Sequence, residues 1–203
     1  MITIRTANPE DVPAIVDVHI QAFPGFFLTL MGRPFLRLLY HGFMQSRQGM
    51  VHVAVNGQGH VVGFVAGTSQ PQGFFTQLLV KQWFRFGLAA VWPLLRRPSL
   101  VGIKLWSALF YRGESLPDLP NAALLSSLGV HPQAHRQGLG RQLVAAFVAW
   151  SVRQGCPAVY LTTDQSNNTK ANAFYLECGF QLAGTCKRPP NRILNRYLLR
   201  IQP

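Results

Sequence analysis

Two short segments of the chain carry residue types that suit the binding of a phosphorylated ligand. In the first, an apolar run ending in Leu128-Gly129-Val130 is followed by His135-Arg136-Gln137-Gly138-Leu139-Gly140-Arg141. Glycines let a backbone approach a pyrophosphate closely, and free amides at a helix N-terminus point toward an anion. The arginines can add charge-assisted hydrogen bonds. Taken alone, a G-x-G helix start is equally consistent with a tight turn.

The second segment runs from Asn168 to Phe180 and reads as a helix followed by a strand. Asn168 and Tyr175 are seven residues apart, which is two helical turns, so they lie on one helix face. Gly179 suits the position just after the helix, where a left-handed backbone is common. The two segments together favour a ligand site more strongly than either does alone.

The elements that must position these segments alternate between helix and strand. Strands are expected at residues 2–6, 50–55, 60–67, 124–130, 158–163, 180–186 and 192–201, and helices after Asn8 and at 33–44, 137–154 and 169–178. Asn56-Gly57 between two apolar runs predicts a hairpin. This alternation predicts an α/β fold with a sheet of mixed direction, in a single domain spanning residues 1–203.

Residues 72–112 differ from the rest of the chain because they are aromatic and basic and hold no acidic residue. They contain Trp83, Trp92 and Trp106, and the cations Lys81, Arg85, Arg96, Arg97, Lys104 and Arg112. The apolar positions suit two helices broken near Pro93 and Pro98, and the charges exclude a membrane span. A helical cap whose aromatic side chains face the core is favoured over an element that lies on a membrane surface.

Composition limits the partners and the compartment. The chain of 203 residues has 19 Lys and Arg against 7 Asp and Glu, a net charge of +12, which attracts anionic partners. Nucleic acid is not favoured, because no finger spacing, RNP-like strand or purely basic helix is present. The odd number of cysteines and the absence of C-x-x-C spacing predict reduced thiols and no metal site. Without a leader-like N-terminus, we expect a cytoplasmic protein, with peripheral membrane contact as the alternative.

The two segments resemble the motifs of the GNAT superfamily of acyl-CoA-dependent N-acetyltransferases. The family's phosphate loop reads Q/R-x-x-G-x-G/A, and its second motif often reads N-x-x-A-x-x-x-Y-x-x-x-G-F. This chain has His135, Gly138 and Gly140 in the first, and Asn168, Ala171, Tyr175, Gly179 and Phe180 in the second. The resemblance implies a largely antiparallel central sheet flanked by helices. Residues 72–112 would then be a helical insertion between the third and fourth strands.

The resemblance also implies roles for individual residues. Acetyl-CoA would be the co-substrate, with its pyrophosphate held by the amides of residues 137–141 and by His135 and Arg136. Leu128, Gly129 and Val130 would lie on a splayed strand that pairs with the pantetheine arm and polarises the thioester, and Asn168 would bond to the pantetheine. Tyr175 would protonate the departing thiolate, which a phenol can do. His135 stands where the family has Gln or Arg, so one contact to the phosphate or within the turn is left unassigned.

The expected reaction is direct attack by a primary amine on acetyl-CoA within a ternary complex. The general base is unassigned: Ser126 and Ser127 stand where the family often has a glutamate, and Glu114, Asp118 and His131 are alternatives. The identity of the acceptor would be determined by residues 23–33 and 72–112. The expected acceptor is a small-molecule or sugar-linked amine that carries an anionic group. Whether the chain forms a homodimer is left open. The other interpretations are an inactive CoA-binding module and a peripheral membrane protein.

Overall fold

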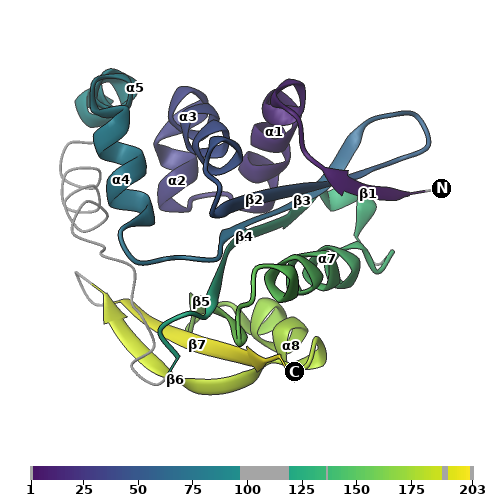
Figure 1. Cartoon of the computed structure of the whole chain (residues 1–203). Coiled ribbons are helices and arrows are strands. Elements are labelled where there is room, and N and C mark those ends of the chain that lie inside the picture. The colour runs from purple at the N-terminus through teal and green to yellow at the C-terminus, as the bar shows by residue number, and fades with distance from the viewer. Residues whose placement is uncertain (1, 97–118, 136, 189–191, 202–203) are drawn as a thin grey trace.

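The computed structural model describes residues 2–96, 119–135, 137–188 and 192–201. Its centre is a seven-stranded sheet in the order β1-β2-β3-β4-β5-β7-β6 (Figure 1). The strands are β1 Thr3–Thr6, β2 Gly49–Val55, β3 Val61–Thr68, β4 Ala123–Val130, β5 Ala158–Asp164, β6 Gln181–Arg188 and β7 Arg192–Arg200. Every neighbouring pair is antiparallel except β4 and β5. The predicted mixed, largely antiparallel α/β sheet is confirmed.

Helices cover both faces of this sheet (Figure 1). The helical elements are η1 Pro9–Asp11, α1 Val12–Ala22, α2 Phe27–Leu30, α3 Gly32–Gln45, α4 Phe74–Lys81, α5 Trp83–Arg96, η2 Pro132–Ala134, α7 Leu139–Arg153 and α8 Thr169–Glu177. One core cluster lies between α1, α3 and the β2–β3 hairpin, with Phe43 and Phe64 fully buried. A second lies under α7, around Phe147 and Leu143. The two clusters fix the sheet between its helical layers.

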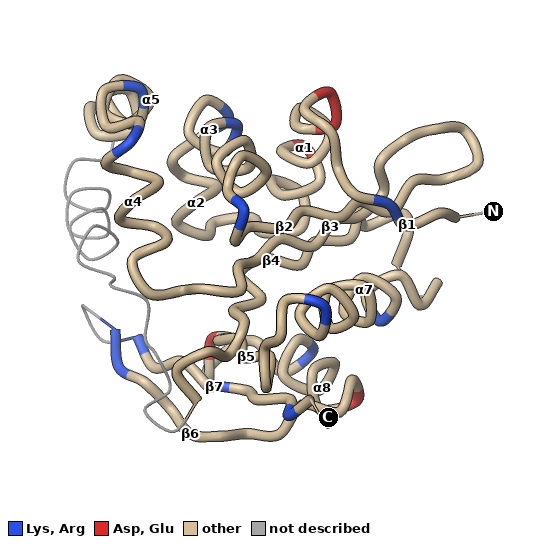
Figure 2. The backbone as a smooth tube through the Cα atoms, in the orientation of Figure 1, with Lys and Arg blue, Asp and Glu red and all other residues tan. Residues whose placement is uncertain are grey.

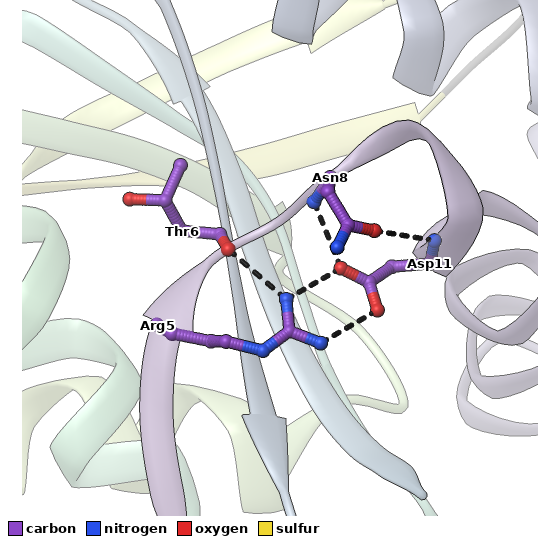
Figure 3. A network of polar contacts seen from close by, with 4 residues as sticks. All are labelled: Arg5, Thr6, Asn8 and Asp11. Carbon is purple, nitrogen blue, oxygen red and sulfur yellow. Dashed lines mark hydrogen bonds and ion pairs between the residues drawn. The ribbon is translucent and has the colours of Figure 1, made fainter. Parts of the chain in front are cut away.

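The turn from β1 into α1 is held by a network of polar contacts (Figure 3). The side chain of Asn8 accepts a hydrogen bond from the amide of Asp11, and Asp11 accepts one from the amide of Asn8, which forms the expected capping arrangement. Arg5 donates two hydrogen bonds to the Asp11 carboxylate, at 2.6 and 2.8 Å. These bonds lower the pKa of Asp11. They anchor the start of α1, whose other end reaches the site described below.

Helices α4 and α5 lie between β3 and β4 in the chain, within the range expected for the insertion. The predicted break near Pro93 is wrong: the helices separate at Gln82, and Pro93 lies inside α5. The expected break near Pro98 and the rest of the segment to residue 112 lie outside the described residues. Phe86 packs against Phe35 of α3 with ring centroids 5.0 Å apart. Part of the segment therefore covers the core, as a cap would.

Candidate active site

The central feature of the site is the separation of the parallel strands β4 and β5. They are paired only at Ala123 with Val159 and at Leu124 with Tyr160. Beyond these two pairs the strands diverge, and Figure 1 shows β1–β4 and β5–β7 as two parts of the sheet that move apart. Backbone groups on the facing edges of both strands are thus left for another partner.

A bulge in β4 lies at the point where the divergence begins. On β3, Ala66 pairs with Ser127 and Gly67 pairs with Leu125, so Ser126 is an extra residue on β4. A bulge bends its strand and increases the local twist. It also re-aims the side chains that follow, which explains how β4 can leave β5 while it stays paired with β3.

A cavity of about 890 Å³ occupies the space between the diverging strands. Its walls are the C-terminal parts of β4 and β5, the start of α7, one face of α8 and the segment between α1 and α2. The predicted residues on its wall are Leu128, Val130, His135, Gly138, Leu139, Gly140, Arg141, Asn168 and Tyr175. Gly129 and Gln137 do not line it, and Arg136 lies outside the described residues. The fold thus gathers most of the predicted site at one cavity.

The loop predicted to bind phosphate ends at Gly138, which is the N-cap of α7 in a left-handed conformation with φ of 71°. No side chain caps the helix, so its first amides face the cavity without a side-chain partner. A β-carbon at residue 138 would meet no atom within 4 Å. Its glycine is therefore required for backbone conformation and for open access, which is the geometry that an anion needs.

Gly140, in the first turn of α7, has a different role in the same motif. A β-carbon on this residue would lie 3.0 Å from Cζ of Phe174 on α8. The small residue lets the N-terminus of α7 approach the α8 helix that carries Tyr175. The two glycines of the motif thus act separately, one through conformation and the other through helix packing.

His135 folds back onto the end of β4. Its Nε2 lies 3.1 Å from the carbonyl oxygen of Val130. The imidazole therefore links the loop to the end of the strand through a turn contact. Arg141 also borders the cavity, where it donates a hydrogen bond of 2.7 Å to Glu177.

Helix α8 presents Asn168 and Tyr175 to the cavity. Tyr175 is buried, and burial raises its pKa well above the ordinary value of a phenol. Within the part of the chain that the structure describes, its hydroxyl has no hydrogen-bond partner. Asn172, which sequence reasoning missed, ties the helix to β5: its amide donates to the carbonyl oxygen of Asp164 at 3.0 Å and its side-chain oxygen accepts from Thr163.

The opposite end of the cavity is aromatic and apolar. Its wall there includes Phe23 and Phe26 of the turn between α1 and α2, and Phe27 and Leu28 at the start of α2. Asp164 and Arg192 form an ion pair beside them, and the Arg192 guanidinium carbon lies 6.0 Å from the centre of the Phe26 ring. None of residues 72–96 lines the cavity. The described part of the basic segment therefore forms none of the cavity wall.

A buried histidine on α1 also borders the cavity. Nδ1 of His19 lies 2.6 Å from the hydroxyl oxygen of Tyr40 on α3, and Tyr40 is in turn hydrogen-bonded to Ser127 of β4. Nε2 of His19 is buried and has no partner among the described residues. Burial lowers the pKa of His19 to about 4, so the ring is neutral at physiological pH. In the neutral tautomer whose Nδ1–H donates to the Tyr40 oxygen, Nε2 carries no hydrogen and can accept a proton.

Of the three candidate bases expected from the sequence, His131 is the one that the described residues include. His131 accepts a hydrogen bond from the amide of Gln133 and does not line the cavity. Glu114 and Asp118 lie outside the described residues. Ser126 and Ser127 are both on the cavity wall, at the positions expected for a family glutamate. No group of His, Cys, Asp and Glu within the described ranges could hold a metal ion.

Comparison with known proteins places this geometry in a class. Residues 106–180 match the model of the acetyltransferase (GNAT) family. None of the curated protein sequences is significantly similar to the chain. Among solved structures, a proposed GNAT-family acetyltransferase from Desulfovibrio desulfuricans is 15% identical, covers 100% of both chains and has a TM-score of 0.65.

Two further structures share the fold. The ribosomal-protein-S18-alanine N-acetyltransferase from Escherichia coli is 18% identical over 100% of this chain and 96% of that one, with a TM-score of 0.58. A proposed streptothricin acetyltransferase from Bacillus anthracis, in complex with acetyl coenzyme A, is 15% identical over 80% of this chain and 68% of that one, with a TM-score of 0.51. The resemblance to GNAT N-acetyltransferases is confirmed. The matched segment and the shared fold are thus similar to those of GNAT acetyltransferases, a class of enzymes that use acetyl-CoA as co-substrate.

Proposed function

We propose that the chain transfers the acetyl group of acetyl-CoA to the primary amine of an acceptor, by direct attack within a ternary complex in one domain formed by residues 1–203. One observation carries the proposal. The cavity between β4 and β5 joins a phosphate-type helix N-terminus on one side to an aromatic pocket with a neutral, buried histidine on the other. Such a cavity can hold two substrates end to end.

The co-substrate would lie along the diverging strand. The pyrophosphate would face the free amides at the start of α7, with Lys170 and Arg141 adding positive charge nearby. The edge of β4 at Leu128 and Val130, which β5 leaves unpaired, offers backbone groups to the amide-containing pantetheine arm. Asn168 at the start of α8 would be a further donor. This arrangement would place the thioester close to Tyr175.

Tyr175 suits the role of donor to the leaving group. Because burial raises its pKa, the phenol is protonated at physiological pH and can donate to sulfur as the C–S bond breaks. The same burial makes a lasting phenolate costly, so the proton must be replaced quickly from the acceptor side or from water.

His19 is the group that we infer to receive the amine proton. As the nitrogen attacks the carbonyl carbon, the new C–N bond makes that nitrogen acidic, and Nε2 of His19 takes one proton. The hydrogen bond between Nδ1 and Tyr40 fixes the ring and connects it to Ser127 on the cavity wall. The reaction moves one proton from the amine to His19 and one from Tyr175 to the sulfur. Transfer of a proton through solvent from His19 to Tyr175 then restores both side chains.

The acceptor pocket supports an amine attached to an aromatic or apolar body. Phe23, Phe26 and Phe27 supply flat apolar walls. Arg192 is already paired with Asp164, but it remains 44% exposed and can contact an acceptor carboxylate or phosphate as well. A small-molecule or sugar-linked amine with an anionic group fits these features. Direct transfer is supported by the cysteines, because none of the three lines the cavity and burial raises the pKa of Cys156 and Cys178.

The first test is binding of acetyl-CoA, measured by calorimetry and by the shift in melting temperature. Gly138→Asp puts a carboxylate into the phosphate loop and should abolish binding. Gly155→Asp is the matched control, because Gly155 has the same φ of 71° and the same open surroundings just beyond the other end of α7. Loss of binding in both variants, or in neither, would contradict the assigned loop.

The second test is turnover with a panel of amines, followed by release of the CoA thiol. We expect activity with aromatic primary amines that bear an acidic group, and no acetylated enzyme by mass spectrometry. Tight binding of acetyl-CoA without turnover on any amine would favour the inactive CoA-binding module.

We also propose a cytoplasmic location, on the basis of three free thiols. No helix among the described residues is long and apolar enough to cross a membrane.

A further inference from the structure

The outward face of α5 is apolar along its whole length. Phe84, Leu88, Val91 and Leu95 are 66%, 67%, 47% and 71% exposed. Their spacing of four, three and four residues places them in one line on the helix. The inward face is separate and consists of Phe86, Ala90 and the partly buried Leu94. The helix therefore has two apolar faces, of which the core uses one.

Cations and tryptophans flank the exposed line. A second line on α5, beside the first, consists of Arg85, Trp92 and Arg96, which are seven and four residues apart. The Arg96 guanidinium lies over the Trp92 ring, 4.6 Å from its centre, and Trp92 remains 61% exposed. Trp83 at the start of the helix is 71% exposed, and Lys81 ends α4 next to it. Figure 2 shows the basic residues on α5 at one edge of the molecule.

The charge of this surface selects its partner. Helices α3, α4 and α5 contain no acidic residue. A second copy of α5 packed against the first would bring cations of the same sign together. An anionic surface would attract them, and an apolar layer beneath it would receive Phe84, Leu88, Val91 and Leu95. Tryptophan and arginine at the border of an apolar stripe are typical of a helix that lies in a membrane interface.

We propose that α5, with the C-terminal end of α4, lies in the headgroup region of an anionic lipid bilayer. The exposed line enters the acyl boundary, while Lys81, Arg85 and Arg96 contact the lipid phosphates. The site cavity opens elsewhere, since no residue of α4 or α5 lines it. The surface would hold the enzyme at a membrane and leave the exchange of acetyl-CoA and acceptor free.

The test is flotation of the full chain with phosphatidylglycerol-rich vesicles and with pure phosphatidylcholine vesicles. We expect binding to the first and little to the second, weakened by salt. Arg85→Gln with Arg96→Gln should weaken binding about fivefold per charge removed. Leu88→Gln with Leu95→Gln should also release the protein. All four residues are exposed, so folding should be retained.

Two control pairs match these changes elsewhere on the surface. Arg47→Gln with Arg153→Gln removes the same charge, and Leu176→Gln with Leu182→Gln removes apolar side chains that are 52% and 55% exposed. Equal loss in the controls, equal binding to neutral vesicles, or no binding by the unmodified chain would overturn the proposal. The proposal would also be overturned if the chain bound no vesicles but formed a dimer, and if Leu88→Gln with Leu95→Gln abolished that dimer. Acetyl-CoA binding by every variant separates this result from the fate of the proposed reaction.

Discussion

Gly140 and Phe174 define how closely the phosphate loop approaches the helix that carries Tyr175. A β-carbon at residue 140 would lie 3.0 and 3.1 Å from two atoms of the phenylalanine ring. Contacts this short require the Phe174 ring to shift by a few tenths of an ångström, and the ring lies against α7. The second glycine of the motif thus links the proposed co-substrate loop to the position of the proposed proton donor.

Gly140→Ala should therefore lower the free energy of unfolding by about 1–3 kcal/mol, as overpacking does. Ordinarily glycine to alanine within a helix stabilises by up to about 1 kcal/mol. Gly87→Ala on α5, where no atom lies within 4 Å of the added carbon, provides that comparison. Denaturant unfolding of both variants, and of Gly140→Ala with Phe174→Leu, checks the prediction. Stabilisation by Gly140→Ala would refute the steric argument.

Tyr175→Phe should reduce kcat by about a hundredfold, a loss in the range of general acid catalysis, and leave the Kd for acetyl-CoA unchanged. Tyr197→Phe is the matched control, because Tyr197 is also buried, its ring centre lies 6.3 Å from that of Tyr175, and it does not line the cavity. Turnover is measured with any amine that the screen identifies. Unchanged kcat in Tyr175→Phe would remove this residue from the reaction.

His19→Gln should lower kcat by about a hundredfold or more, again with acetyl-CoA binding intact. Tyr40→Phe keeps the imidazole but removes its hydrogen bond, so we expect a smaller loss. The pH profile separates a base from a structural residue. Because the pKa of His19 is about 4, the unmodified enzyme should not lose this group between neutral pH and pH 5, and a loss of activity with a midpoint near 6.5 would contradict the assignment.

Stability should also depend on His19. Its pKa is 6.5 when exposed and about 4 in the folded protein. Below pH 6.5 the unfolded chain binds a proton that the folded chain resists, so stability is lost as the pH falls from 6.5 through 4, by an amount on the order of 3 kcal/mol. His52, whose pKa burial also lowers, acts in the same direction. Unfolding of His19→Gln and His52→Gln at several pH values should show a flatter dependence in each; an unchanged slope in His19→Gln would mean that its ring is solvated.

The sequence predicted the parts of the site that depend on local backbone geometry. Gly138 and Tyr175 sit in motifs where conformation and helical spacing are set within a few residues. His19 carries no local sequence signal of a role in the site, because its contact is with Tyr40, which is 21 residues away. The pairing of Arg192 with Asp164 was hidden for the same reason.

Helix α5 shows a second limit of periodicity. Both the line through Phe84 and Leu88 and the line through Phe86 and Ala90 are apolar with helical spacing. The helical repeat of apolar residues in a sequence shows that a helix has an apolar face. It does not show which of two apolar faces packs against the core. The expectation that the aromatic residues of this segment face the core is met by Phe86, and not by Trp83 or Trp92, which are exposed.

The narrow join between β4 and β5 has a consequence for how the molecule unfolds. Two residue pairs connect the backbones of the first four strands and the last three, so without a ligand the two parts are held mainly by side-chain packing under α7. Acetyl-CoA bound along both strand edges would add backbone contacts across this boundary. The amides of β4 beyond Leu124 that point away from β3 should then exchange slowly with deuterated solvent only in the complex, whereas those paired with β3 are protected in both states. The co-substrate would raise the cooperativity of unfolding as well as the melting temperature.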